Sequence, residues 1–102
     1  MFLKELKRVE IILEGEHIDS LKRILEKIEI GGYTIFHNLE GKGAKGYHEG
    51  RLLFNEEDAL VMLMTVVEEE KMEAIVKGLQ PFFEKHSGRI FVSEARMALY
   101  VS

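Results

Sequence analysis

Hydrophobic and polar residues largely alternate along residues 9–14, where Val9, Ile11 and Leu13 point to one face. The other face has Glu10, Ile12 and Glu14. This alternation predicts a strand with one buried face. Residues 33–39 and 89–93 are also predicted as strands, because both are rich in β-branched and aromatic residues. We expect the last strand to continue at 97–101, with a bend or a bulge at 94–96.

A helical period first appears in residues 19–30. The apolar stripe of this predicted helix consists of Leu21, Ile24, Leu25 and Ile28. Asp19 or Ser20 is predicted to cap the first turn, because a short polar side chain can accept a bond from the unpaired N–H groups there. The glycines at 31 and 32 are predicted to end the helix, because glycine tolerates the left-handed conformation.

A second helix is predicted to begin near Glu69 or Glu70, since carboxylates suit the positive end of a helix. Its predicted buried stripe is Met72, Ile75, Val76, Leu79 and Phe83. Pro81 is expected to kink or end this helix, leaving a distorted last turn over 82–86. The residues Ser87 and Gly88 then form a turn into the last strand.

The third strand, residues 59–67, is apolar on both faces. With helices on one side of the sheet only, its second face would meet water, so the pattern predicts a cover, most simply another copy of the chain. The order β-α-β-β-α-β with two right-handed crossovers predicts an α+β, ferredoxin-like plait. Its four strands would be antiparallel, with the first and third in the centre and both helices on one face.

The long connection between the second and third strands, about residues 41–58, begins with a glycine-rich run, GKGAKGYHEG. Glycine permits close backbone approach to a ligand, and lysine supplies a cation for an anion. The run therefore indicates a mobile loop that binds phosphate, although a polar hairpin connection is the more common use of such residues. It is not a P-loop, because no Gly-Lys-Ser/Thr sequence ends it.

Composition narrows the classes of function. The chain has 46% hydrophobic and 31% charged residues, a net charge of −4 and no cysteine. The acidic balance argues against nucleic-acid binding, and the absence of cysteine excludes disulfides and thiolate metal sites. No apolar run is long enough to span a membrane, and the N-terminus lacks the core of a signal peptide. We expect one cytoplasmic domain over residues 1–102, with no direct membrane insertion.

Other candidate chemistry is sparse. His48 and Glu49 are metal-ligand types within the long connection, but solvated loop residues are the simpler interpretation. The acidic run 68–70 is interpreted as a solvated helix start, and His86 as an ordinary helix-end residue. His37 is predicted on a strand, where it either faces a cleft or occupies an exposed position. No Ser/His/Asp order or paired carboxylates indicate catalysis, so an enzyme is not predicted.

Several segments together resemble the P-II signalling proteins (nitrogen regulatory protein P-II superfamily). They are the order of elements, the Gly-Tyr-Thr sequence at 32–34, the Gly-Lys-Gly start of the long connection, and GRIFVS at 88–93. The resemblance covers nearly the whole chain. It implies a homotrimer with an adenine nucleotide (AMP, ADP or ATP) in each cleft between subunits. It also implies a loop at 41–58, the family's T-loop, that regulates a membrane transporter or a metabolic enzyme.

The resemblance also implies roles for individual residues. Thr34 would contact the adenine ring, and Val66 would offer its backbone to it. The loop residues implied to approach the phosphates are Gly41, Lys42, Gly43, Lys45 and Gly46. Gly88 and Arg89 would hold phosphate, with arginine where the family has lysine.

The chain departs from the family pattern where phosphate would be bound. The two phosphate-binding arginines of the family's last strand correspond to Tyr100 and Ser102, which are uncharged. The loop is shorter, and it lacks the family's Arg-Gln pair and a recognisable context for modification of Tyr47. Because each charge-assisted hydrogen bond contributes about 1.5–3 kcal/mol, ATP binding of the usual kind is not expected. The resemblance is closer to divergent, short-loop P-II-like proteins, some of them associated with carbonate or metal transport.

Three functions remain open at this point. The first is a trimeric sensor of adenine nucleotides that acts on a partner through residues 41–58. The second is a metal- or small-anion-responsive trimer like the CutA-type proteins, without nucleotide binding. The third is a structural oligomer with no ligand.

Overall fold

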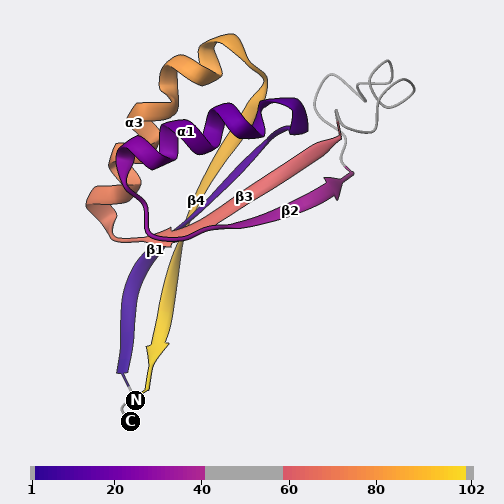
Figure 1. Cartoon of the computed structure of the whole chain (residues 1–102). Helices are drawn as coiled ribbons and strands as arrows, with labels where there is room; N and C mark the ends of the chain where they lie inside the picture. The colour runs from indigo at the N-terminus through magenta and orange to yellow at the C-terminus, as the bar shows by residue number, and fades with distance from the viewer. Residues whose placement is uncertain (1, 41–58, 101–102) are drawn as a thin grey trace.

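The computed structural model describes residues 2–40 and 59–100. The elements in chain order are β1 (Phe2–Glu14), the short 3-10 helix η1 (Gly15–His17), α1 (Ile18–Ile28), β2 (Thr34–Leu39), β3 (Leu60–Val67), α3 (Glu69–Lys85) and β4 (Gly88–Leu99). Figure 1 shows one sheet with α1 and α3 packed on the same face of it. The predicted order of strands and helices is confirmed.

The four strands form one antiparallel sheet in the order β2-β3-β1-β4. β1 and β3 are therefore central, as the two right-handed crossovers predict. The predicted ferredoxin-like plait is confirmed, and its sheet has one face covered by helices and one open face.

The hydrophobic core lies between the helices and one face of the sheet. Its fully buried side chains are Val9, Ile11 and Leu13 of β1, Leu63 of β3, Leu21 and Leu25 of α1, and Ile75 and Leu79 of α3. The alternation predicted for residues 9–14 and the helical stripe of residues 21–28 therefore both point into this core. Within the described residues, every buried side-chain nitrogen or oxygen has a hydrogen-bond partner.

β1 and β4 are longer than predicted. β1 begins at Phe2 rather than at Val9, and its register with β4 is unbroken from the Phe2–Leu99 pair to the Leu13–Gly88 pair. The bend expected at 94–96 is absent, because backbone pairing with β1 continues through these residues. β3 pairs with β1 only from Lys7 onward, so residues 2–6 and 95–99 form a two-stranded arm. Figure 1 shows this arm extending away from the helices.

Both ends of α1 differ from the prediction. The N-cap residue is His17, without a side-chain capping bond, and Asp19 lies inside the first turn. The left-handed residue at the C-terminal end is Glu29 (φ 64°, ψ 49°), not a glycine. This end is held by Lys71 of α3, whose Nζ donates a hydrogen bond to the carbonyl of Ile28 at 2.8 Å.

α3 continues through Pro81 to Lys85, so the helix does not end at the proline. Its buried residues are Ile75, Leu79 and Phe82, whereas Val76 is exposed and Phe83 is only partly buried. The prediction that Val76 belongs to the buried stripe was wrong, and Phe82 was missed. Phe82 follows Leu79 by three residues and Ile75 by seven, and this spacing keeps it on the core side of the helix.

β3 is apolar on both faces, as predicted. Val61, Leu63 and Val67 are buried under the helices, together with Thr65, whose hydroxyl donates a 2.6 Å hydrogen bond to the carbonyl of Gly32. The alternate residues Leu60, Met62, Met64 and Val66 point to the opposite side and are partly or fully exposed. We call that side of the sheet the open sheet face.

β2 pairs regularly with β3 only over its first half. A register shift lies between Phe36 and Leu39, and Asn38 adopts a positive φ of 57°. The strand predicted over residues 33–39 is therefore irregular in its second half. His37 is exposed, which fits both of its predicted placements, a cleft or an exposed strand position.

Candidate functional site

Four of the predicted ligand-binding residues lie in the described part of the chain: Thr34, Val66, Gly88 and Arg89. The other five, Gly41, Lys42, Gly43, Lys45 and Gly46, lie outside the described residues, as do His48 and Glu49. The position of the four described residues in the sheet determines what kind of site they can form.

Thr34 and Val66 are neighbours on the open sheet face. Thr34, the first residue of β2, pairs with Met64 of β3, and Val66 lies two residues farther along the same strand. Both are exposed, Val66 at 39%. An aromatic ring placed here would meet an apolar side chain, a hydroxyl and the end of a strand.

Gly88 and Arg89 begin β4 at the opposite edge of the sheet. Arg89 is exposed and pairs with Ile12 of β1, so its side chain also points to the open sheet face. Between β2 and β4 lie three inter-strand spacings, or about 14 Å at 4.8 Å each. A single chain therefore keeps the predicted adenine-contacting pair apart from the predicted phosphate-binding pair.

Gly88 also has a packing reason to be glycine. A Cβ atom at this position would overlap Cε1 of Phe83 and would lie 2.7 Å from the carbonyl oxygen of Ile12. The backbone of β4 thus passes close to α3 just before Arg89. This close approach fixes the backbone position from which the Arg89 side chain extends.

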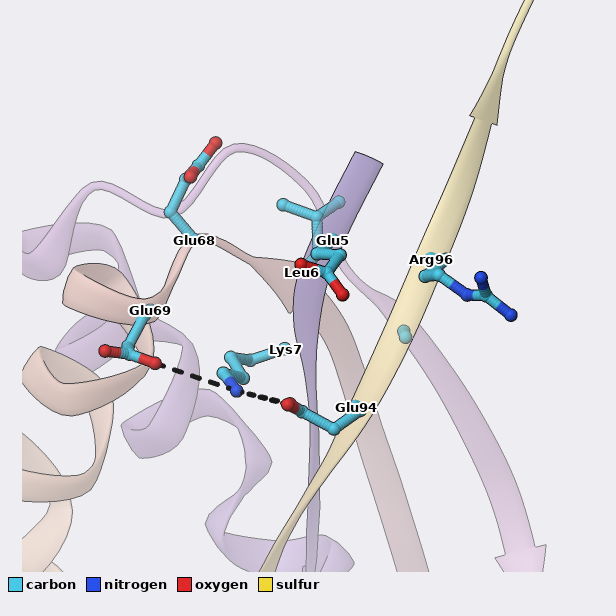
Figure 2. A pocket seen from close by; sticks show the side chains of 8 residues that line it. Glu5, Leu6, Lys7, Glu68, Glu69, Glu94 and Arg96 are labelled. Carbon is cyan, nitrogen blue, oxygen red and sulfur yellow. Dashed lines mark hydrogen bonds and ion pairs between the residues drawn. The ribbon is translucent and has the colours of Figure 1, made fainter. Parts of the chain in front are cut away.

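A second polar cluster lies where the arm leaves the body of the protein. Glu5, Leu6, Lys7, Glu68, Glu69, Glu94, Ala95 and Arg96 line a pocket there. Figure 2 shows Lys7 between two carboxylates from different elements. Its Nζ donates a 2.7 Å hydrogen bond to Glu94 and forms a 3.6 Å ion pair with Glu69, while Lys4 pairs with Glu68 at 2.7 Å.

The hydrogen bond to Glu94 and the charges of both carboxylates raise the pKa of Lys7, against a smaller opposing effect of desolvation. Both lysines of this cluster are thus paired with carboxylates within the chain, and the Lys7 contacts hold β4, β1 and α3 together. Sequence reasoning missed the cluster, because only the β1–β4 register places Lys7 opposite Glu94. The interpretation of the acidic run 68–70 as a helix start is confirmed, since Glu69 and Glu70 lie in the first turn of α3.

Comparison with known proteins gives the family. The family model of nitrogen regulatory protein P-II matches residues 6–101. The chain therefore belongs to the P-II family of signalling proteins, which are regulators rather than enzymes. No helix in the described residues is long and apolar enough to cross a membrane.

Among solved structures, the chain resembles CPII, a nitrogen regulatory PII-like protein from Thiomonas intermedia K12. A structure of CPII bound to ADP, AMP and bicarbonate is 47% identical, with a TM-score of 0.83, over 94% of this chain and 91% of that chain. CPII bound to ADP and bicarbonate is 44% identical, with a TM-score of 0.80 and the same shares of each chain.

A putative PII-like signalling protein from Thermus thermophilus is 25% identical, with a TM-score of 0.74, over 95% of this chain and 93% of that chain. The comparison with curated proteins finds no match. The sequence-based resemblance to the divergent, PII-like members of the family is thus confirmed, and the protein is a PII-like signalling protein.

Proposed function

We propose that this protein senses adenine nucleotides, ADP or AMP, in clefts between the subunits of a homotrimer, together with bicarbonate. The observation that carries the proposal is the separation of Thr34 and Val66 from Gly88 and Arg89 across the sheet. Residues two or three strand spacings apart in one chain, about 10–14 Å, can meet around one nucleotide when they come from two chains. Bicarbonate enters the proposal because CPII was solved with ADP and bicarbonate.

The open sheet face supports the homotrimer. It exposes Phe36 (41%), Val66 (39%) and Phe91 (50%) beside the partly buried Met62 and Met64. Arg8 and Glu10 of β1 lie on the same face, between β3 and β4. Exposed apolar side chains gathered on one sheet face in this way mark an association site. In the proposed trimer the open faces of three chains pack together, which covers the second apolar side of β3.

The charges along β4 support a nucleotide with few phosphates. Arg89 is an exposed cation at the start of β4, and in the proposed site it holds phosphate as a fork-shaped donor. Tyr100 and Ser102 stand where the family has two further arginines, so cations for a third phosphate are missing. ADP and AMP are therefore the proposed ligands in preference to ATP, and the solved CPII complexes hold ADP and AMP.

The proposed output is regulation of a transporter or metabolic enzyme in the cytoplasm, through residues 41–58. In this proposal Gly41, Lys42, Gly43, Lys45 and Gly46 approach the phosphates from that segment. The whole chain, 1–102, acts as one domain, and no contact with nucleic acid is involved.

Calorimetric titration with ADP, with and without bicarbonate, tests the proposal through an Arg89→Ala variant. A charge-assisted bond contributes about 1.5–3 kcal/mol, so ADP affinity should fall by roughly 10- to 150-fold. The measurement should also give about one nucleotide per chain for the unchanged protein.

Arg96→Ala is the matched control, because Arg96 lies on the same strand but lines the pocket beside Lys7 on the other side of the sheet. Its ADP affinity should be unchanged. Equal ADP affinities for the unchanged protein and both variants would show that Arg89 does not contact the nucleotide. If no binding of ADP, AMP or ATP were detected, the CutA-like alternative, which lacks nucleotide binding, would be favoured.

A further inference from the structure

The end of β1 and the η1 helix bring three metal-ligand side chains together, and the proposed nucleotide site uses none of them. Glu14 ends β1, and Glu16 and His17 belong to η1. Each offers one ligand atom, and the three atoms all lie within 4.8 Å of one another. Two carboxylates and an imidazole converge here because η1 turns the chain sharply after the strand.

The spacing suits a bound ion. Nε2 of His17 and Oε1 of Glu16 are 3.5 Å apart. Two ligand atoms about 2.0–2.2 Å from a tetrahedral metal ion stand roughly 3.4 Å apart, so this pair already has the required separation. The side chain of Glu16 is 49% exposed, which leaves the ion a path from solvent.

The His17 ring is held in place by packing. It lies 4.1 Å from the His86 ring, centroid to centroid, and contacts Phe82 edge-on at 6.1 Å. The backbone is anchored as well, because the N–H of Gly15 donates a 2.9 Å hydrogen bond to the carbonyl of Ala59. A ligand whose orientation is set by its surroundings loses little freedom on binding a metal.

We propose that Glu14, Glu16 and His17 bind a divalent first-row transition metal ion of the Zn²⁺ type. Imidazole with carboxylates suits such ions, whereas Mg²⁺ and Ca²⁺ prefer oxygen ligands throughout. Three protein ligands leave a coordination position for water or another small ligand. His86 is a positioning residue, because it packs on the His17 ring and is not one of the three converging ligands.

The site adjoins the start of β4. Leu13, which precedes Glu14, is the β1 partner of Gly88. A metal ion here would stabilise the junction of β1, η1 and β3, through Gly15 and Ala59, next to the residues proposed to hold phosphate. This second ligand goes beyond the proposed nucleotide function and does not depend on it.

The test is calorimetric titration of the full, tag-free chain with Zn²⁺ in the absence of nucleotide. We expect one Zn²⁺ per chain, and a decrease in affinity of at least about tenfold in each of His17→Gln and Glu16→Gln. His86→Phe should retain Zn²⁺ binding, because phenylalanine can replace the packing of the imidazole. Melting temperatures measured in chelator establish that each variant is folded.

Two matched controls use the remaining histidines. His37→Gln, on β2, and the double variant His48→Gln, Glu49→Gln should bind Zn²⁺ as the unchanged protein does. Absence of Zn²⁺ binding, or binding that survives in His17→Gln and is lost in the 48/49 variant, overturns the proposal. Neither result affects the ADP titration, so the two proposals can fail separately.

Discussion

A Gly88→Ala variant should lose about 1–3 kcal/mol of unfolding free energy, the usual cost of forcing a methyl group into packed structure. The added Cβ would overlap the Phe83 ring and lie 2.7 Å from the carbonyl oxygen of Ile12. Phe83 is a side chain that can move, but Ile12 belongs to a central strand whose backbone is paired on both sides. Urea denaturation monitored by circular dichroism measures the change.

Gly31→Ala is the control for this experiment. A Cβ at Gly31 would have no heavy atom within 4 Å, and its φ is not in the left-handed range. This substitution should leave the protein unchanged or stabilise it by about 0.4–1 kcal/mol, because alanine restricts the unfolded chain. If Gly88→Ala were as stable as Gly31→Ala, β4 would not approach α3 as closely as described.

The second large effect is expected from Phe91→Lys, which should convert the proposed trimer into monomers. Phe91 lies on the open sheet face and is 50% exposed in the single chain, so lysine fits there without disturbing the fold. In an oligomer that buries this face, the lysine would replace aromatic packing with a charge that must leave water. Its cross-strand neighbour Glu10 offsets only part of this desolvation cost, so association becomes unfavourable. Light scattering should give 11.8 kDa for the variant and three times that mass for the unchanged protein.

Val92→Lys is the matched control, because Val92 is the next residue of β4, is 43% exposed and points to the other face of the sheet. It should remain a trimer. A trimer in both variants would show that the open sheet face is not the contact. A monomer for the unchanged protein would contradict the argument from β3 directly.

The candidate site could be predicted only in part. Motif resemblance located Thr34, Gly88 and Arg89 in the sequence, since each belongs to a short local pattern, and the resemblance of the whole chain to the family added Val66. Thr34 lies on one edge strand, Val66 on the strand beside it, and Gly88 and Arg89 on the opposite edge strand. This division follows from strand order, which is a property of the assembled fold. The convergence of Glu14, Glu16 and His17 was not predicted. Glu14 ends a strand and the other two lie in η1, and no single periodic pattern spans this change of structure.

Elements with a local signal could be predicted without the structure. Two of these signals are periodic: the alternation at Val9, Ile11 and Leu13, and the apolar stripe of α1. Each indicates which side of its own element is buried. The two apolar faces of β3 likewise required no knowledge of its neighbours. Two crossovers of known handedness then restricted these elements to one plait.

Features that depend on a distant part of the chain became visible only in the folded molecule. β1 begins at Phe2 because β4 pairs with it, although the charges of residues 4–8 give no strand signal. Phe82 is buried because the core lies on its side of α3, and Lys7 joins Glu94 and Glu69 because three elements meet there. Long-range pairing and packing stabilise such contacts, and no local window of sequence contains both partners.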